Sequence, residues 1–209
     1  MLHIHAMELG CLDTNCYCLH TDTEAVVIDP GGEHEVILNY LRSKNLTLTT
    51  IVNTHLHFDH IQGNAGLHAA TQAPILASPK DAFLLQTELG GGGMMGFPRT
   101  PPFSFDPLEE GPLPLLGTTC QVLATPGHSP GCMSLYFAER GVVFVGDLLF
   151  YRSVGRTDFP GSSEQELRRS VRTKIFTLPE NTVVYPGHGL STTVRDEQLN
   201  NPFFSEFTR

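Results

Sequence analysis

The stretch NTHLHFDHIQGN, residues 53–64, constrains this chain more than any other part of its sequence. It places His55, His57, Asp59 and His60 within six positions, directly after a β-branched apolar run. Neutral imidazole and carboxylate are the ligands that zinc and related ions prefer. A metal site needs four or more donors for each ion, so further ligands are expected from other parts of the chain.

Three further apolar strands each lead to one residue of the same kind. CQVLATPG leads to His128, GVVFVG to Asp147 and NTVVYPG to His188. In layered α/β folds, sites gather at the carboxyl ends of strands. Gly127 and Gly187 precede two of these histidines and allow the backbone to turn sharply. The candidate metal ligands are therefore His55, His57, Asp59, His60, His128, Asp147 and His188.

This set is too large for one tetrahedral ion and suits two ions that share a bridge. The most economical division gives one ion His55, His57 and His128. The second ion then takes Asp59, His60 and His188. Asp147 bridges the two ions, and a water molecule completes both shells. Two divalent ions supply about +4, the carboxylates −2 and a bridging hydroxide −1, and this small positive sum suits an anionic or polarised substrate.

The remaining histidines are interpreted as structural. His3 and His5 also form an H-x-H pair, but no Asp-His follows them, and we expect them on a polar face of the first strand. His20, His34 and His68 stand alone and are interpreted in the same way.

The hydrophobic pattern predicts two successive β/α halves packed as a single domain over residues 1–209. The predicted strands cover 15–20, 24–30, 46–54, 120–126, 133–138, 141–146 and 181–186. The predicted helices cover 33–44, a stretch ending near 72, 79–88, 162–178 and a short one from about 193.

Three of the predicted segments carry more specific expectations. Val36, Ile37, Tyr40 and Leu41 have helical spacing in the helix over 33–44. The helix over 162–178 places Leu167, Val171, Ile175 and Leu178 on one face, with Ser163 and Glu166 spaced as a capping box. Residues 89–107 follow no period and form a loop, either a lid that presents Met94, Met95 and Phe97 to substrate or a surface excursion.

Composition excludes several classes of partner. The formal net charge of −9 argues against nucleic acid or an anionic membrane as the main partner. No apolar run approaches the roughly 20 residues needed to span a bilayer, and the opening MLHIHAMELG lacks the apolar core of a signal peptide. Five cysteines, an odd number, indicate reduced thiols. We therefore expect a globular cytoplasmic protein, whose oligomeric state the sequence does not fix.

The pattern T-H-x-H-x-D-H, followed by His128, Asp147 and His188, resembles the metallo-β-lactamase superfamily. The resemblance implies an α/β fold, the αββα four-layer sandwich, with two mixed β-sheets flanked by helices and a binuclear metal centre. Asp29 matches the superfamily's first motif, in which the aspartate neighbours the metals without binding them. The true β-lactamases lack a bridging aspartate at the position of Asp147, and the flavo-diiron proteins have a glutamate in place of His57.

Within the superfamily, HIQGN, ATPGHSPG and GRTDFPG look most like glyoxalase II, the hydroxyacylglutathione hydrolases, in their short single-domain form. This implies two Zn²⁺ per chain, with iron or manganese as substitutes, and hydrolysis of a glutathione thioester such as S-lactoylglutathione. Asp59 is the expected catalytic residue, which orients the nucleophile while binding a metal. Arg156 falls where those enzymes have a glutathione-contacting lysine, and Arg152 is expected beside it at the pocket mouth. The tyrosine two positions further on is Asp158 here, and the long enzymes' C-terminal helical extension does not fit in this chain.

A thioester suits such a site because its thiolate leaving group, with a parent pKa of about 8.5, departs without a dedicated acid. No G-x-S-x-G motif offers a serine nucleophile instead. Two alternatives stay open. Lactone hydrolysis needs the same ligands, and GRTDF (155–159) with KIFTLP (174–179) also resembles the one-iron persulfide dioxygenases. The segment TTVRDEQLNNPF (192–203) looks closer to the short hydrolases.

Overall fold

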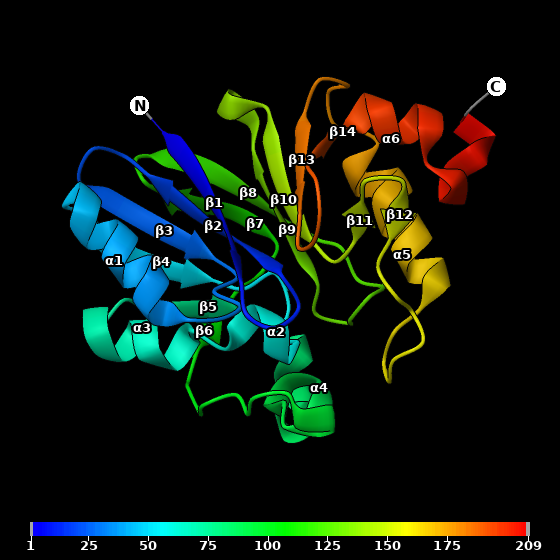
Figure 1. Ribbon diagram of the computed structural model, residues 1–209. Coiled ribbons are helices and arrows are strands. Elements are labelled where there is room, and N and C mark those ends of the chain that lie inside the picture. Colours follow the sequence, from blue (N-terminus) through cyan, green and yellow to red (C-terminus); the bar gives the residue numbers. More distant parts are fainter. Residues whose placement is uncertain (1, 208–209) are drawn as a thin grey trace. The chain divides into compact units, whose positions relative to one another are not determined.

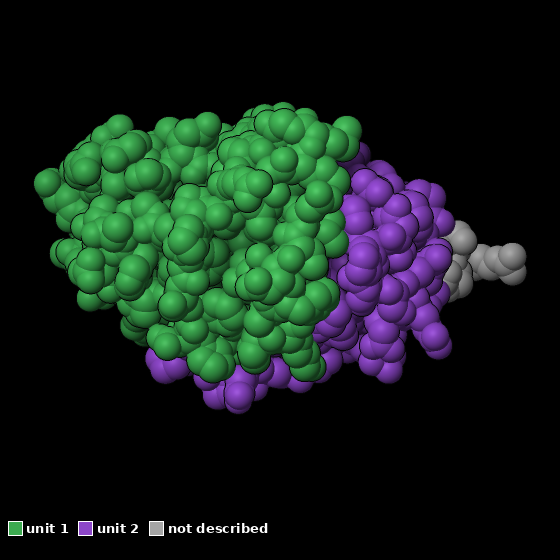
Figure 2. All heavy atoms as spheres, turned by 90° about the horizontal axis from the view of Figure 1, so that it is seen from below, with its two compact units in different colours: residues 1–108, 115–117 green, residues 109–114, 118–209 purple. Residues whose placement is uncertain are grey.

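The structure is a computed structural model that describes residues 2–207. The chain forms two compact units, each with its own six-stranded sheet (Figure 1, Figure 2). Unit 1 contains the residues up to Leu108 together with Leu115–Gly117. Unit 2 contains Glu109–Pro114 and the residues from Thr118 onward.

The sheet of unit 1 has the strand order β1-β2-β3-β4-β5-β6. Its strands are β1 (His3–Leu9), β2 (Thr14–His20), β3 (Glu24–Ile28), β4 (Thr47–Val52), β5 (Ile75–Ala77) and β6 (Asp106–Pro107). The first three are antiparallel and the later pairs are parallel, so the sheet is mixed. The helices are α1 (His34–Lys44), α2 (Phe58–Ile61), α3 (Asn64–Thr71) and α4 (Glu88–Gly91), with 3₁₀ turns at Pro79–Gln86 and Met94–Gly96.

Helices α1 and α3 pack on the same sheet of unit 1 (Figure 1). Ile37 and Leu41 of α1 and Leu67 of α3 are buried against strand residues that include Val27 and Ile51. Complete burial of such a side chain contributes about 1.5–3 kcal/mol. Val36, which the helical spacing assigned to the same face, is 45% exposed. The core-facing stripe is instead centred on Ile37, Leu38 and Leu41, and Val36 lies about 100° around the helix from Ile37.

The sheet of unit 2 has the strand order β14-β13-β10-β9-β8-β7. Its strands are β7 (Gly111–Leu115), β8 (Thr118–Ala124), β9 (Met133–Phe137), β10 (Val142–Gly146), β13 (Val183–Pro186) and β14 (Thr192–Thr193). The pair β10–β13 is parallel and its neighbours are antiparallel, so this sheet is also mixed. A separate hairpin joins β11 (Leu149–Phe150) to β12 (Ser153–Val154). The helices are α5 (Glu164–Ser170) and α6 (Val194–Asn200), with a π turn at Val171–Ile175 and 3₁₀ turns at Ala138–Arg140 and Pro202–Phe207.

The helix predicted over 162–178 is shorter and changes its period. Its N-cap is Ser163, whose hydroxyl accepts a hydrogen bond from the backbone N–H of Glu166 at 3.3 Å. The Glu166 carboxylate pairs with Arg169, so the structure supports only the serine half of the predicted capping box. The α-helix becomes a π turn after Ser170, yet the predicted apolar face is correct, since Leu167, Val171 and Ile175 pack against β10 and β13.

No helix within residues 2–207 is long and apolar enough to cross a membrane.

All five cysteines are free thiols, and only Cys11 is exposed. Burial raises the pKa of Cys18 and of Cys120 to about 12. At pH 8 we therefore expect one fast-reacting thiol per native chain in a DTNB titration, with the other four slower by at least about 100-fold. Cys11→Ser should remove the fast phase, and denaturant should expose all the thiols. Two or more fast thiols in the native protein would contradict this burial pattern.

Candidate metal centre

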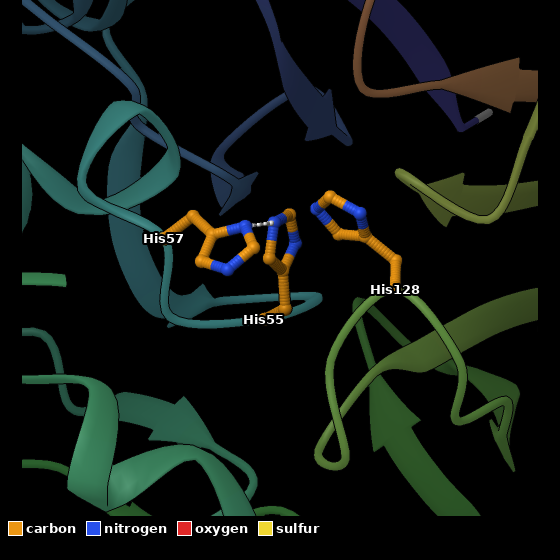
Figure 3. A group of neighbouring side chains, drawn as sticks. All are labelled: His55, His57 and His128. Carbon is orange, nitrogen blue, oxygen red and sulfur yellow. Dashed lines mark hydrogen bonds between the residues drawn. The ribbon is translucent and has the colours of Figure 1, made fainter. Parts of the chain in front are cut away.

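The four predicted ligands of unit 1 lie in the loop between β4 and α2 and in α2 itself. The chain leaves the sheet after Val52, and His55, His57, Asp59 and His60 follow within one loop and one helical turn, all buried. His55 Nε2 lies 3.1 Å from His57 Nδ1, and Figure 3 shows the two rings with these nitrogens facing each other. The sequence therefore folds so that several buried imidazole rings lie next to one another.

Asp29 organises this cluster from the end of β3. Its carboxylate is buried and accepts hydrogen bonds from the Thr54 backbone N–H at 2.7 Å and from the Thr54 hydroxyl at 2.6 Å. It also accepts from His60 Nδ1 at 3.0 Å. One ligand-type atom from each of Asp29, His55 and His60 lies within 4.8 Å of the others. Because Asp29 accepts three hydrogen bonds from Thr54 and His60, it fits the role of a neighbour of the metals, as the resemblance implied.

The same contacts fix the tautomers of two histidines. A carboxylate only accepts, so His60 Nδ1 carries the proton and His60 Nε2 keeps its lone pair. The Thr54 hydroxyl gives its only proton to Asp29 and must therefore accept from His55 Nδ1, 3.1 Å away. His55 Nε2 then also keeps its lone pair. Hydrogen-bonded outer partners of this kind orient histidine ligands in metal proteins.

Asp59 is held by a neighbouring strand and by close packing. Thr14, the first residue of β2, donates a hydrogen bond to Asp59 Oδ2 at 3.2 Å, and His60 Nε2 lies 3.5 Å from the same oxygen. A Cβ atom at Gly31 would lie 2.0 Å from the Asp59 backbone oxygen, so only glycine fits there. The PGG segment after β3 thus allows the Asp59 backbone to pack directly against Gly31.

Two supports of this loop were not predicted from the sequence. Asp81, buried in the Pro79–Gln86 turn, accepts a hydrogen bond from the backbone N–H of Leu56, between the two histidines of the H-x-H pair. Asn53 donates to the His60 backbone oxygen at 3.2 Å and accepts from Asn64 at 2.8 Å. No spacing rule singles out these residues, because each pairing joins residues that only the tertiary fold brings together.

The three predicted ligands of unit 2 also meet at strand ends. His128 follows β8, Asp147 follows β10 and His188 follows β13. Asp147 Oδ2 lies 3.5 Å from His128 Nε2 and 3.6 Å from His188 Nε2. His128 and Asp147 are buried and His188 is partly exposed. Asp147 is therefore the central member of this set, as a bridging ligand would be.

His128 is oriented by a backbone carbonyl. Its Nδ1 donates to the Arg156 backbone oxygen at 2.8 Å, so its Nε2 keeps the lone pair that faces Asp147. Figure 3 shows the ring at the tip of its own loop. Gly127 precedes it with φ +151°, and a Cβ there would lie 2.3 Å from Leu167 Cα. Both units thus present buried imidazoles beside carboxylates, a donor set that fits divalent transition-metal ions.

The two predicted substrate-contacting arginines are both engaged within unit 2. Arg156 donates a bidentate pair of hydrogen bonds to the Asp158 carboxylate, at 2.9 Å from Nε and 2.8 Å from a terminal guanidinium nitrogen. Its guanidinium also lies over the Phe159 ring. Its hydrogen bond lowers the pKa of Asp158. Substrate binding by Arg156 stays a prediction. The guanidinium of Arg152 is bound to Asp196 and Glu197, and its place at a pocket mouth stays a prediction.

The segment over 89–107 is less irregular than predicted, since α4, a 3₁₀ turn and β6 occupy parts of it. Phe97 stacks on Phe58, the first residue of α2, with ring centroids 5.2 Å apart. Met95 is 87% exposed. Phe97 therefore contacts the element that carries Asp59 and His60, whereas Met95 is solvated, and the choice between a lid and a surface excursion stays open to test.

The model of the metallo-β-lactamase superfamily matches residues 9–188. The chain belongs to this superfamily. The match includes all seven predicted ligands and Asp29, and the predicted fold class is confirmed. The chain is accordingly a metal-dependent hydrolase of the superfamily.

Two curated relatives cover nearly the whole chain. The probable metallo-hydrolase YqgX of Bacillus subtilis is 37% identical over 205 residues, which are 97% of both chains. The hydroxyacylglutathione hydrolase GloC of Haemophilus influenzae is 33% identical over 209 residues, which are 98% of this chain and 99% of GloC.

Three solved structures extend the likeness. The B3 metallo-β-lactamase BLEG-1 is 38% identical with a TM-score of 0.92, covering 97% of this chain and 100% of its own. TTHA1623, solved in a di-iron-bound form, is 40% identical with a TM-score of 0.86, covering 95% and 99%. ETHE1 from Myxococcus xanthus is 30% identical with a TM-score of 0.78, covering 96% and 83%.

Proposed function

We propose that this chain hydrolyses thioesters at a binuclear metal centre. One ion is held by His55, His57 and His128. The other is held by Asp59, His60 and His188, with Asp147 as the bridging ligand. The observation that carries the proposal is the set of buried imidazoles whose Nδ1 protons are committed to acceptors, which leaves Nε2 lone pairs to bind metal. Zinc is the proposed metal, and the di-iron form of TTHA1623 makes iron the first substitute to test.

Bound metal of this kind supplies a water of lowered pKa and an electrophile for the acyl oxygen. The chain's own residues hold the geometry. Asp59, whose carboxylate accepts a hydrogen bond from the hydroxyl of Thr14, would orient the attacking water. Asp29 and Thr54 keep His55 and His60 in the tautomers that carry the proton on Nδ1 and the lone pair on Nε2. No serine or cysteine nucleophile is required.

The substrate class is proposed from the leaving group and from the relatives. A thiolate departs without a general acid, since its conjugate acid has a pKa of about 8.5. GloC, similar over almost the full length, is a hydroxyacylglutathione hydrolase. We therefore propose a glutathione thioester such as S-lactoylglutathione, with Arg156 as a contact for a substrate carboxylate if it exchanges Asp158 for that group.

The test combines metal analysis with turnover of S-lactoylglutathione by one preparation. We expect close to two ions per chain, hydrolysis that a chelator abolishes, and recovery when zinc is added back. The metal-stripped protein is the control. A protein that carries two ions and leaves the thioester intact would contradict the substrate assignment.

Two alternative activities would use the same predicted ligands. Metal analysis and activity assays on the same preparation distinguish them. The resemblance of GRTDF and KIFTLP to the one-iron persulfide dioxygenases makes that activity the second candidate, and it predicts one iron per chain and oxygen consumption with glutathione persulfide. Lactone hydrolysis predicts two ions and a preference for lactones over S-lactoylglutathione.

We also propose that residues 1–209 act as one domain, since the superfamily model runs across both units. A cytoplasmic location is proposed from the five reduced thiols.

A further inference from the structure

Glu197 is a fully buried carboxylate that belongs to none of the groups discussed for the metal centre. It lies on α6, and its two oxygens accept four hydrogen bonds. Glu197 Oε1 accepts from the Arg152 guanidinium at 2.9 Å and from the Thr192 hydroxyl at 2.7 Å. Glu197 Oε2 accepts from the Arg152 backbone N–H at 3.0 Å and from the Asn201 side chain at 2.7 Å. Burying a carboxylate is costly, and this complete set of donors offsets the cost.

These contacts hold one residue in an unusual backbone conformation. Arg152 has φ +59°, in the left-handed region that non-glycine residues rarely adopt. It lies in the turn between β11 and β12, and both its backbone N–H and its guanidinium bind the same carboxylate. Asn201 also donates to the Ser153 backbone oxygen at 3.1 Å. Helix α6 thereby fixes the tip of the β11–β12 hairpin.

The hairpin and the residues at its two ends contact all three predicted metal ligands of unit 2. Asp147 lies two residues before β11, and a Cβ at Gly155, directly after β12, would lie 1.8 Å from the Asp147 backbone oxygen. The next residue, Arg156, supplies the carbonyl that binds His128 Nδ1. Phe150 of β11 lies edge-on to the His188 ring, with centroids 6.1 Å apart.

We propose that Glu197 is a positioning residue for the metal centre, which sets the affinity for metal by fixing the hairpin between Asp147 and Arg156. The proposal rests on the proposed function, because it assumes that His128, Asp147 and His188 bind metal. Glu197 acts through the turn at Arg152, whose conformation determines where the Asp147 and Arg156 ends of the hairpin lie. Its own carboxylate contacts Arg152, Thr192 and Asn201, which are not among the predicted metal ligands.

The test is the affinity of Glu197→Gln for zinc, measured by competition with a chromophoric chelator. Glutamine keeps the size of the side chain. Its NH₂ group, however, faces N–H or O–H groups that had donated hydrogen bonds to the carboxylate oxygen. We expect the affinity to fall about 10- to 100-fold, the range seen when an outer partner of a metal ligand is lost. Amide hydrogen exchange over residues 149–154 should accelerate in the same variant.

Two controls separate positioning from a general loss of stability. Glu180→Gln removes an exposed ion pair with Arg195, which lies on α6 like Glu197, and should leave zinc affinity unchanged. Ile37→Val, in the core of unit 1, should lower the unfolding temperature without faster exchange in the hairpin. If Glu197→Gln does not fold, Arg152→Gln tests the same link from the other side.

Wild-type zinc affinity in a folded Glu197→Gln or Arg152→Gln variant would overturn the positioning role while leaving the proposed function intact. A wild-type protein that binds no metal would overturn both. Wild-type binding without thioester turnover would contradict the substrate alone and leave the role of Glu197 standing.

Discussion

Replacing Asp147 by alanine should lower the metal content from about two ions per chain to one or fewer and reduce thioester turnover by on the order of 1,000-fold. Asp147 is buried, and its Oδ2 lies within 3.6 Å of both His128 Nε2 and His188 Nε2. Alanine removes the only carboxylate in this set of three predicted ligands. In the proposed centre, two cations would then lose the negative charge of their bridging ligand, so the second ion would bind far more weakly.

The measurement is the metal content of Asp147→Ala after equilibration against a chelator buffer, with turnover measured on the same sample. Asp106→Ala is the matched control, because Asp106 is an exposed aspartate of β6 that belongs to no predicted site. Two tightly held ions in Asp147→Ala would show that this residue is not the bridge, even if activity falls.

Most of the strands could be predicted from the sequence because their apolar runs end at strong turn residues. The run GVVFVG, for example, ends at the glycine before Asp147 and forms β10. β7 was missed because GPLPL contains two prolines, which a central strand does not accept. β7 lies at the edge of its sheet, where a residue that faces away from the neighbouring strand needs no N–H to donate. The π turn after Ser170 was missed because its apolar spacing still matches a helix.

The candidate ligands were easier to predict than the residues that support them. A ligand stands at the end of a strand, and its type and position are visible in a linear pattern. Thr54, Asp81 and Glu197 act through contacts with residues 25 to 45 positions away. Such pairings depend on where the elements pack, which spacing alone does not encode. Asp29 was found only because it matched a motif of the superfamily.

Replacing Asp29 by alanine should cost about 3–5 kcal/mol of stability and abolish tight metal binding. The buried Thr54 N–H and hydroxyl and the His60 ring would each lose their acceptor. Alanine also strains the backbone, since Asp29 has φ +50°. Asp13→Ala controls for that strain, because Asp13 has φ +52° and is exposed. Thermal unfolding compares the two, and equal losses of stability would contradict a special role for the Asp29 carboxylate.

Asp29→Asn separates the fold from the metal chemistry. The remaining amide oxygen can still accept from the Thr54 N–H, so stability should fall much less than in the alanine variant. The new NH₂ group donates where Oδ2 accepted, and it forces His60 Nδ1 to become an acceptor and the Thr54 hydroxyl to donate to His55 Nδ1. Both rings would then carry their protons on Nε2, the nitrogens needed for metal. Zinc affinity should therefore fall by at least about 100-fold in a folded protein. Nitrogen-15 NMR of the imidazoles reads the tautomers directly, and unchanged Nδ1 protonation with wild-type zinc affinity would refute the role of Asp29.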